Sequence, residues 1–288
     1  TQGLVKVLSL VSGTWKERLR VVWNALKDAY VSGGSERASL IRESLLVALR
    51  LYELGVPIPA IAIAFRYAAI GDMTLALKWY SLADASDSRD SRMAILLAQV
   101  ELLEGKWNPD MSRDSLVRSR PGTALVVLHN SLPWSLSGYA TRSHGLLQGI
   151  QAEGWDLTVV TRPGFPAEDI GFESDKPVTA EDLIDGIRYR RLDTDGYAYN
   201  QCPVTAYIAR YAIALEREIR RARPAVIHAA SNYISGIAAV IAARRTGVPV
   251  VYEVRGLWDL TRSSKQPEWE GSDQQRMQRL MEIRAARA

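Results

Sequence analysis

Short apolar runs alternate with stretches of helical spacing after Gly122, and this alternation restricts the possible fold more than any other feature of the chain. Strands are predicted where the apolar runs lie, over residues 123–129, 155–161, 186–192, 225–229 and 248–254. Helices are predicted over residues 139–153, 204–223, 233–246 and 273–288. Strands that are apolar along their whole length are typical of parallel sheets with helices on both faces. The pattern therefore predicts an α/β fold with a doubly wound parallel sheet.

The first part of the chain has helical spacing throughout, so we predict an all-helical domain over residues 1–119 and the sheet domain over residues 120–288. Breaks between its helices are expected at residues 55–57, 71–72 and 84–90, and a polar linker is expected at residues 108–122. The spacing of Gly71, Ala76, Tyr80 and Ala83 resembles the second helix of a tetratricopeptide repeat. Such hairpins pack against neighbours or bind proteins, so a protein partner for the helical domain is one prediction.

Residues 4–30 form a basic amphipathic stretch, for which two interpretations stay open. Its apolar stripe docks on the rest of the helical domain, or it lies on an anionic membrane surface. No apolar run reaches the roughly 18–20 residues that a membrane-spanning helix needs. With one cysteine, Cys202, no internal disulfide can form. We therefore expect a cytoplasmic protein, with peripheral contact to the inner face of the membrane as a further possibility.

Composition limits the function classes. The chain is 47% hydrophobic and 24% charged, as is typical of a folded globular protein. A net charge of +4 allows an anionic partner such as a phosphate-bearing substrate. The basic residues are scattered without interleaved aromatic residues, so no nucleic-acid binding is expected. No cysteine spacing of a metal site occurs, and we expect neither a metal nor a cofactor.

In an open parallel sheet, ligands bind beyond the carboxyl ends of the strands. Three predicted loops lie there, at residues 129–142, 228–233 and 253–259. In the first loop Ser137 and Gly138 precede a helix, where free amides favour an anion, and Arg142 can add a guanidinium group. Helix capping by Ser137 alone is the other interpretation. No G-x-G-x-x-G motif follows the first strand, which disfavours a dinucleotide-dependent oxidoreductase.

The other two loops contain polar residues at strand ends. His228 ends a strand, and Ser231 and Asn232 precede a helix, where each is either a binding residue or part of the local structure. Glu253 and Arg255 are two apart on one strand and so point to the same side. Either they pair with each other, or the arginine is free to contact a phosphate or a sugar.

The order SGYATRSHGLLQGIQAEGWDLTVVTRPGFP, then AVIHAASNYISGIAAVIAARRTGVPVVYEVRGLWD, resembles the N-terminal Rossmann-like domain of family 4 glycosyltransferases. The resemblance covers roughly residues 123–288. It implies one half of a GT-B fold and retaining transfer of a sugar from a nucleotide-sugar donor to an acceptor hydroxyl. The donor is then a substrate and not a cofactor. A glycan or lipid-linked acceptor and a role in polysaccharide biosynthesis are implied as well.

The three loops and the resemblance together give candidate site residues, although no catalytic residue is identified. The candidates for binding the donor phosphates or sugar are Ser137, Gly138, Arg142 and Arg255. The candidates for lining the cleft or binding the acceptor are His129, Asn130, His144, His228, Ser231, Asn232, Glu253 and Trp258. Many family members have a histidine near this position, so Arg255 is a departure from the family pattern.

The family's second Rossmann domain is expected to follow a helix such as residues 273–288, where this sequence ends. We therefore expect these residues to supply the acceptor-side half of the cleft and to be inactive by themselves. The alternative is a non-catalytic scaffold, in which the helical domain binds a partner protein and the Rossmann-like domain is a degenerate support.

Overall fold

The structure is a computed structural model. It describes residues 37–53, 55, 58–83, 87–169, 172–173, 175, 177–193, 199 and 201–288. The amphipathic stretch at residues 4–30 lies outside these ranges.

Contacts group the chain into two compact units, which we describe separately. The helical unit comprises the residues up to Leu96 and the segment Asp259–Arg276. The sheet unit comprises residues Leu97–Trp258 and Met277–Ala288. The domain ranges 1–119 and 120–288 stay a prediction from the sequence, because grouping by contact measures compactness and not independent folding.

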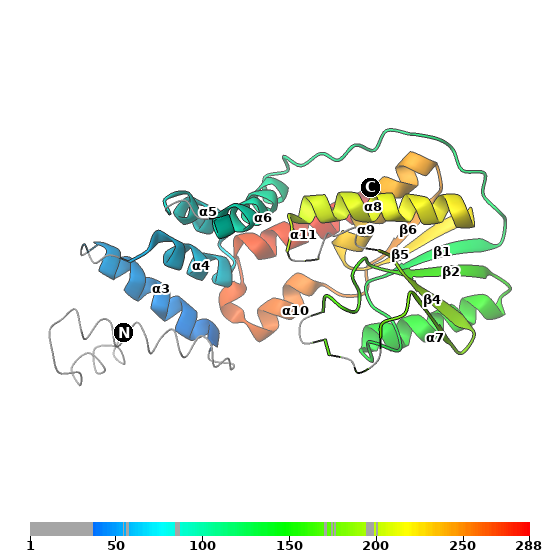
Figure 1. Cartoon of the computed structure of the whole chain (residues 1–288), viewed down its shortest axis with the longest axis horizontal. Coiled ribbons are helices and arrows are strands. Elements are labelled where there is room, and N and C mark those ends of the chain that lie inside the picture. The colour runs from blue at the N-terminus through cyan, green and yellow to red at the C-terminus, as the bar shows by residue number, and fades with distance from the viewer. Residues whose placement is uncertain are drawn as a thin grey trace. The chain divides into compact units, whose positions relative to one another are not determined.

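The sheet unit is built on one six-stranded sheet in the order β3-β4-β2-β1-β5-β6. Its elements are β1 (Thr123–Leu128), α7 (Gly138–Ala152), β2 (Asp156–Thr161), β3 (Glu181–Ile184), β4 (Ile187–Arg191), α8 (Val204–Ala222), β5 (Val226–Ala230), α9 (Tyr233–Thr246) and β6 (Val250–Glu253). All neighbouring strands are parallel except β3 and β4. Helices α8 and α9 lie on one face of the sheet and α7 on the other (Figure 1). The predicted α/β fold with a largely parallel, Rossmann-like sheet is confirmed.

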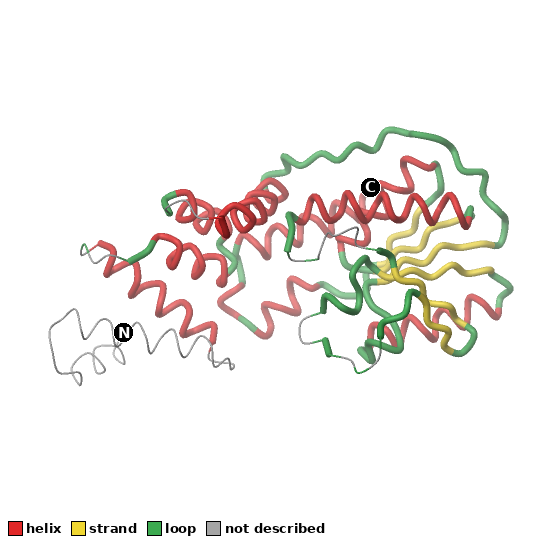
Figure 2. Tube along the Cα trace, in the orientation of Figure 1, coloured by secondary structure: helices red, strands yellow, loops and turns green. Residues whose placement is uncertain are grey.

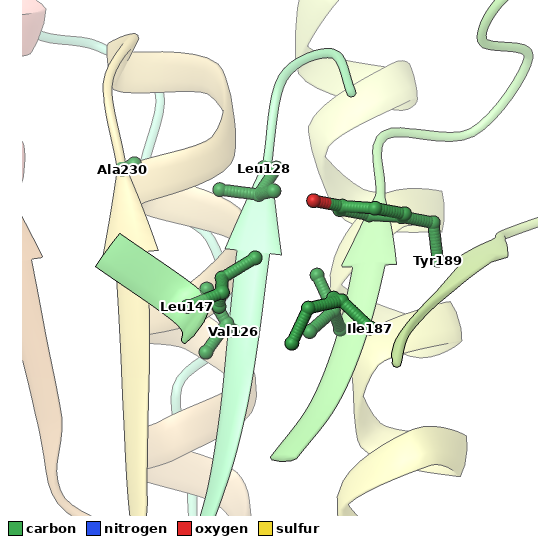
Figure 3. Packing of buried hydrophobic residues seen from close by; sticks show 7 residues of the cluster. Val126, Leu128, Leu147, Ile187, Tyr189 and Ala230 are labelled. Atoms are coloured by element: carbon green, nitrogen blue, oxygen red, sulfur yellow. The ribbon is translucent and has the colours of Figure 1, made fainter. Parts of the chain in front are cut away.

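The core of this unit lies on the central strands. Every residue of β1 is buried, as its unbroken apolar sequence predicts. Val126 and Leu128 of β1 pack with Leu147 of α7 and with Ile187 and Tyr189 of β4 (Figure 3). Burial of these side chains removes apolar surface from water, which is the main driving force for covering the sheet with helices.

Strand β3 is a feature that the sequence analysis did not predict. It is antiparallel to β4 and is joined to it by the two residues Asp185 and Gly186. Both have positive φ, at 48° and 83°, as in the two-residue turns that connect the strands of a hairpin. The Asp-Gly pair is a known hairpin signal, and it adds an antiparallel edge strand to the otherwise parallel sheet.

Between α6 and β1 the chain has no helix or strand from residue 104 to residue 122, as expected for the polar stretch 108–122 (Figure 2). Its backbone is nevertheless held in place. The amides of Val117 and Arg120 donate to the carbonyls of Thr246 and Arg223, at 2.9 and 2.8 Å. These carbonyls lie at the ends of α9 and α8, where helix carbonyls lack partners within the helix.

The helices of the helical unit follow the predicted breaks closely. They are α3 (Arg37–Glu53), α4 (Ala60–Ile70), α5 (Met73–Ser81) and α6 (Asp87–Leu103), of which α6 continues into the sheet unit. The later segment adds α10 (Trp258–Lys265), the 3-10 turn η1 (Pro267–Trp269) and the start of α11 (Asp273–Arg287). Ala76 and Tyr80 of α5 are buried, which fits the helical-hairpin spacing. The tetratricopeptide resemblance itself stays a prediction.

Within the described part of the chain, no helix is both long enough and apolar enough to cross a membrane.

A glycine in α9 allows close packing against β6. A Cβ atom at Gly236 would lie 2.5 Å from Cε2 of Tyr252, whose hydroxyl is itself held by a bond to Glu282. We predict that Gly236→Ala lowers the free energy of unfolding by about 1–3 kcal/mol, because the aromatic ring has to move. Gly149→Ala in α7 is the matched control, since a Cβ there meets no atom within 4 Å. The control should be neutral or up to about 1 kcal/mol more stable. Chemical denaturation measures both, and equal effects would refute the packing argument.

Candidate functional site

Strands β1, β5 and β6 are neighbours in the sheet, so the loops that follow them meet at one edge. Glu253, the last residue of β6, is the residue that the other candidates at this edge contact. One carboxylate oxygen is 3.1 Å from Nη2 of Arg142. The other lies 2.9 Å from Nε2 of His228 and 2.8 Å from Nη2 of Arg255. One carboxylate thus joins candidate residues from all three predicted loops.

Arg255 is held on several sides. Its side chain is only 4% exposed. Besides Glu253 it contacts the Ser143 hydroxyl, and its guanidinium carbon lies 5.0 Å from the centre of the Tyr139 ring. Its backbone amide donates to the Ser231 hydroxyl at 2.7 Å. Of the two interpretations of Glu253 and Arg255, the structure supports the first, in which the two side chains pair with each other.

The environment of Glu253 favours its charged form. Burial by itself would raise the pKa of this carboxyl, but the hydrogen bonds and charges of Arg255 and His228 outweigh burial and lower the pKa below its ordinary value. Arg142 adds a further contact, although its side chain is 64% exposed. Exposed ion pairs contribute little, so Arg142 can leave Glu253 at low cost while Arg255 cannot.

Ser137 caps the start of α7, and the space beside Gly138 is open. The Ser137 hydroxyl accepts a hydrogen bond from the Ala140 amide at 3.3 Å, so the capping interpretation holds for this side chain. A Cβ atom at Gly138 would meet no other atom within 4 Å. Packing within the protein therefore does not require a glycine at position 138.

Two amides at the start of α9 have side-chain acceptors. The Asn232 side chain accepts from the Ile234 amide at 3.2 Å, and Oε1 of Glu282 accepts from the Tyr233 amide at 2.8 Å. Glu282 is buried and comes from α11, so no local sequence signal predicts this cap. Ser231 and Asn232 thus have structural partners, and a negatively charged ligand has little access to this helix end.

His129 lies in an aromatic group at the end of β1. Its ring centre is 5.1 Å from that of Trp258 and 6.3 Å from that of Tyr199, both edge to face. Nδ1 of His129 is buried without a hydrogen-bond partner, as is the side-chain oxygen of Asn130. Burial, and secondarily the charge of Arg162, lowers the pKa of His129 to about 3.

His144 lies apart from the other candidates. Its Nδ1 is 2.7 Å from the Tyr189 hydroxyl and its Nε2 is 3.1 Å from Asp185, so it joins α7 to the β3–β4 hairpin. Three further residues, which were not predicted from the sequence, contact the candidate residues. They are Tyr139, Ser143 and Tyr199. Among the described residues, no three His, Cys, Asp or Glu side chains are grouped as metal ligands would be.

The Glu253 contacts predict a strong effect of one amide substitution. Glu253→Gln removes the charge that faces buried Arg255, so we expect the free energy of unfolding to fall by about 2 kcal/mol. Glu181→Gln is the control, because Glu181 also pairs with two arginines, Arg188 and Arg190, but at the surface. The control should cost less than about 1 kcal/mol. Denaturation at neutral pH measures both, and similar losses would contradict the central role of Glu253.

Because Nδ1 of His129 is buried, we expect this histidine to gain its proton only at low pH. The folded pKa of about 3 lies below the unfolded value near 6.5, so the unfolded chain binds the proton first as pH falls. The free energy of unfolding should therefore decrease as the pH drops from 6.5 towards 3. NMR of the three histidines should find His129 neutral at pH 5, and His129→Asn assigns the signal. Titration of His129 near pH 6.5 would contradict the burial argument.

A family model described as "Glycosyl transferase 4-like domain" matches residues 137–288, which include strands β2–β6 and the residues Arg142, His228 and Glu253. No curated protein and no solved structure matches the chain. Because the matched region is just over half of the 288 residues, the chain belongs to the glycosyl transferase 4-like family.

Proposed function

We propose that this chain takes part in retaining transfer of a sugar from a nucleotide-sugar donor to an acceptor hydroxyl, with the sheet unit forming the acceptor side of the cleft. The observation that supports this best is the family match over residues 137–288, within which Arg142, His228, Glu253 and Arg255 meet at the carboxyl edge of the sheet. Such an edge is where open α/β folds bind their ligands.

The first turn of α7 is our proposed contact for the donor diphosphate. The helix start provides free backbone amides, and the lack of a side chain at Gly138 lets a phosphate approach them. Arg142 follows four residues later on the same side of the helix, and its guanidinium is exposed. A diphosphate would replace the weak pair with Glu253 by a charge-assisted contact.

Arg255 has a different proposed role, which is to hold Glu253 and the loop after β6 in position. Its guanidinium is already bonded to Glu253 and Ser143, so a direct phosphate contact would have to replace the ion pair of an arginine whose side chain is buried. Trp258, with 39% exposure, presents part of its ring to solvent beside His129, and aromatic faces pack well on the apolar faces of sugars. We propose this pair as a wall of the acceptor pocket.

The proposed reaction needs little acid–base chemistry from these residues. The bond between the anomeric carbon and the diphosphate oxygen breaks, and a new bond forms from the same face to the acceptor oxygen, whose proton passes to the departing diphosphate. The diphosphate leaves with the negative charge, so a positive group near it stabilises the transition state. Arg142 and the α7 amides supply that charge in our proposal. The acceptor is proposed to be a glycan or a lipid-linked sugar, and the site of transfer the cytoplasmic side of a membrane.

The α7 contact is tested by two substitutions that spare the fold. Gly138→Ala adds a Cβ in open space, so the melting temperature should stay unchanged while binding of nucleotide sugars weakens about tenfold or more. Arg142→Ala should weaken binding by a similar factor and reduce its dependence on salt. Calorimetry with uridine- and guanosine-diphosphate sugars, and with inorganic pyrophosphate, measures both effects.

Gly145→Ala is the control, because it lies on the same helix and its Cβ also meets no atom within 4 Å. It should bind as the unchanged chain does. If the unchanged chain binds no nucleotide sugar and no pyrophosphate, the proposal fails and the non-catalytic scaffold becomes the better explanation. If binding occurs but neither substitution weakens it, the donor contact lies elsewhere.

A further inference from the structure

The carboxylate of Glu253 divides its partners between its two oxygens. Oε2 lies 2.9 Å from Nε2 of His228 and 2.8 Å from Nη2 of Arg255. Oε1 accepts a hydrogen bond from Nη2 of Arg142 at 3.1 Å, and no other described residue donates to this oxygen. The two oxygens therefore depend on different kinds of partner, since the Arg255 side chain is buried and that of Arg142 is exposed.

Oε2 keeps its partners when Arg142 moves. The Arg255 guanidinium also contacts the Ser143 hydroxyl, and its side chain is 4% exposed. Removing one partner of a buried ion pair is costly, because the other charge stays behind without compensation. Glu253 is therefore held in place through Oε2, whatever happens at Oε1.

The departure of Arg142 leaves Oε1 as an unused hydrogen-bond acceptor. In the proposed function the donor diphosphate draws Arg142 away, and the exposed ion pair that is lost contributes little. An ionised carboxylate accepts at both oxygens, so Oε1 then needs a new donor. The Glu253 side chain is 24% exposed, which leaves it open to a ligand. A hydrogen bond from the ligand would replace the one that Arg142 had made.

The charges around Glu253 select the kind of donor that fits. Burial alone would raise the pKa of its carboxyl, but the hydrogen bonds and charges of Arg255 and His228 lower the pKa below its ordinary value, so the group is ionised at neutral pH. Arg255 already balances this charge, and no further cation is required. A phosphate or a carboxylate of a ligand would be repelled by Oε1. A neutral hydroxyl group suits the position best.

The position of Oε1 relative to the start of α7 fits a sugar. Arg142 follows Gly138 by four residues, or about 6 Å along the helix axis at 1.5 Å per residue. From there its guanidinium reaches Oε1. A diphosphate at the α7 start is therefore within one arginine side chain of Glu253. In the proposed reaction two sugars come close to the diphosphate, namely the sugar that it carries and the acceptor.

We propose that Oε1 of Glu253 is the contact for a sugar hydroxyl, and that the donor diphosphate uncovers this contact by taking Arg142 away. Binding of the diphosphate and binding of the hydroxyl then strengthen each other by the same factor. This factor is limited by the worth of an exposed ion pair, which corresponds to about two- to fivefold in affinity. The coupling rests on the proposed function, because it requires a diphosphate at α7.

The test uses the full chain with inorganic pyrophosphate and with neutral methyl glycosides of glucose, galactose and mannose as probes. NMR at neutral pH follows the side-chain carboxyl signal of Glu253 while each glycoside is added. In the unchanged chain, saturating pyrophosphate should tighten glycoside binding about two- to fivefold. Arg142→Ala uncovers Oε1 without a diphosphate. This variant should therefore bind glycosides as tightly as the unchanged chain does with pyrophosphate, and added pyrophosphate should have no further effect.

Arg188→Ala is the matched control. Arg188 is 63% exposed and pairs with Glu181 at 3.0 Å, so its loss also removes one exposed ion pair, but away from Glu253. This variant should keep the full effect of pyrophosphate on glycoside binding. Both substitutions change exposed side chains, and unchanged melting temperatures would show that the fold is intact.

A nucleotide sugar distinguishes the two sources of the hydroxyl. If a uridine- or guanosine-diphosphate sugar moves the Glu253 signal as the glycosides do, and a glycoside then causes no further change, the hydroxyl belongs to the donor sugar. If a glycoside still moves the signal after the nucleotide sugar has bound, the hydroxyl belongs to the acceptor. Either result supports the contact at Oε1.

The contact and its coupling can each fail separately from the donor site. If no glycoside moves the Glu253 signal in Arg142→Ala, the hydroxyl contact is overturned, and this measurement needs no diphosphate. If pyrophosphate binds but leaves glycoside binding unchanged, the coupling through Arg142 is overturned while the donor contact at α7 stands. If pyrophosphate does not bind at all, the donor contact of the proposed function fails, and the coupling fails with it.

Discussion

The carboxylate of Glu253 is the interaction on which the candidate site depends. It ends strand β6 and contacts three positive or titratable groups, from α7, from β5 and from its own loop. Because Arg255 is buried, its charge requires this partner, and the pair in turn fixes Ser143, Tyr139 and Ser231. The loop after β6 is thereby a rigid part of the sheet edge, while the exposed Arg142 keeps the freedom to contact a ligand.

The two helix starts at this edge differ in a way that separates their proposed roles. The α9 start is covered by Asn232 and by the Glu282 carboxylate, so two of its first amides are paired and its partial positive charge already faces a carboxylate. The α7 start has only the Ser137 cap and open space at Gly138. Electrostatics therefore favours an anion at α7, which supports the diphosphate contact that we propose there.

Two segments of the helical unit that are far apart in the sequence meet at Gly71. Asp273 accepts from an amide at the start of α5, and the Gly71 carbonyl accepts from an amide at the start of α11. The same physical rule, that unpaired amides need acceptors, thus operates at α5, α9 and α11. In each case the acceptor comes from a segment far away in the sequence.

The order of strands and helices in the sheet unit was determined by the sequence alone, because apolar periodicity is a local property that each segment has by itself. The same holds for the three loops at the sheet edge, which follow from the strand order. The Asp-Gly hairpin of β3 and β4 was also locally encoded, by two adjacent residues that favour a two-residue turn. The choice between the two interpretations of Arg255, the separate position of His144 and the caps from Glu282 and Asp273 were decided only by the tertiary structure. Such contacts join residues up to 199 positions apart, as Thr74 and Asp273 are, and no local pattern specifies which distant carboxylate meets which amide.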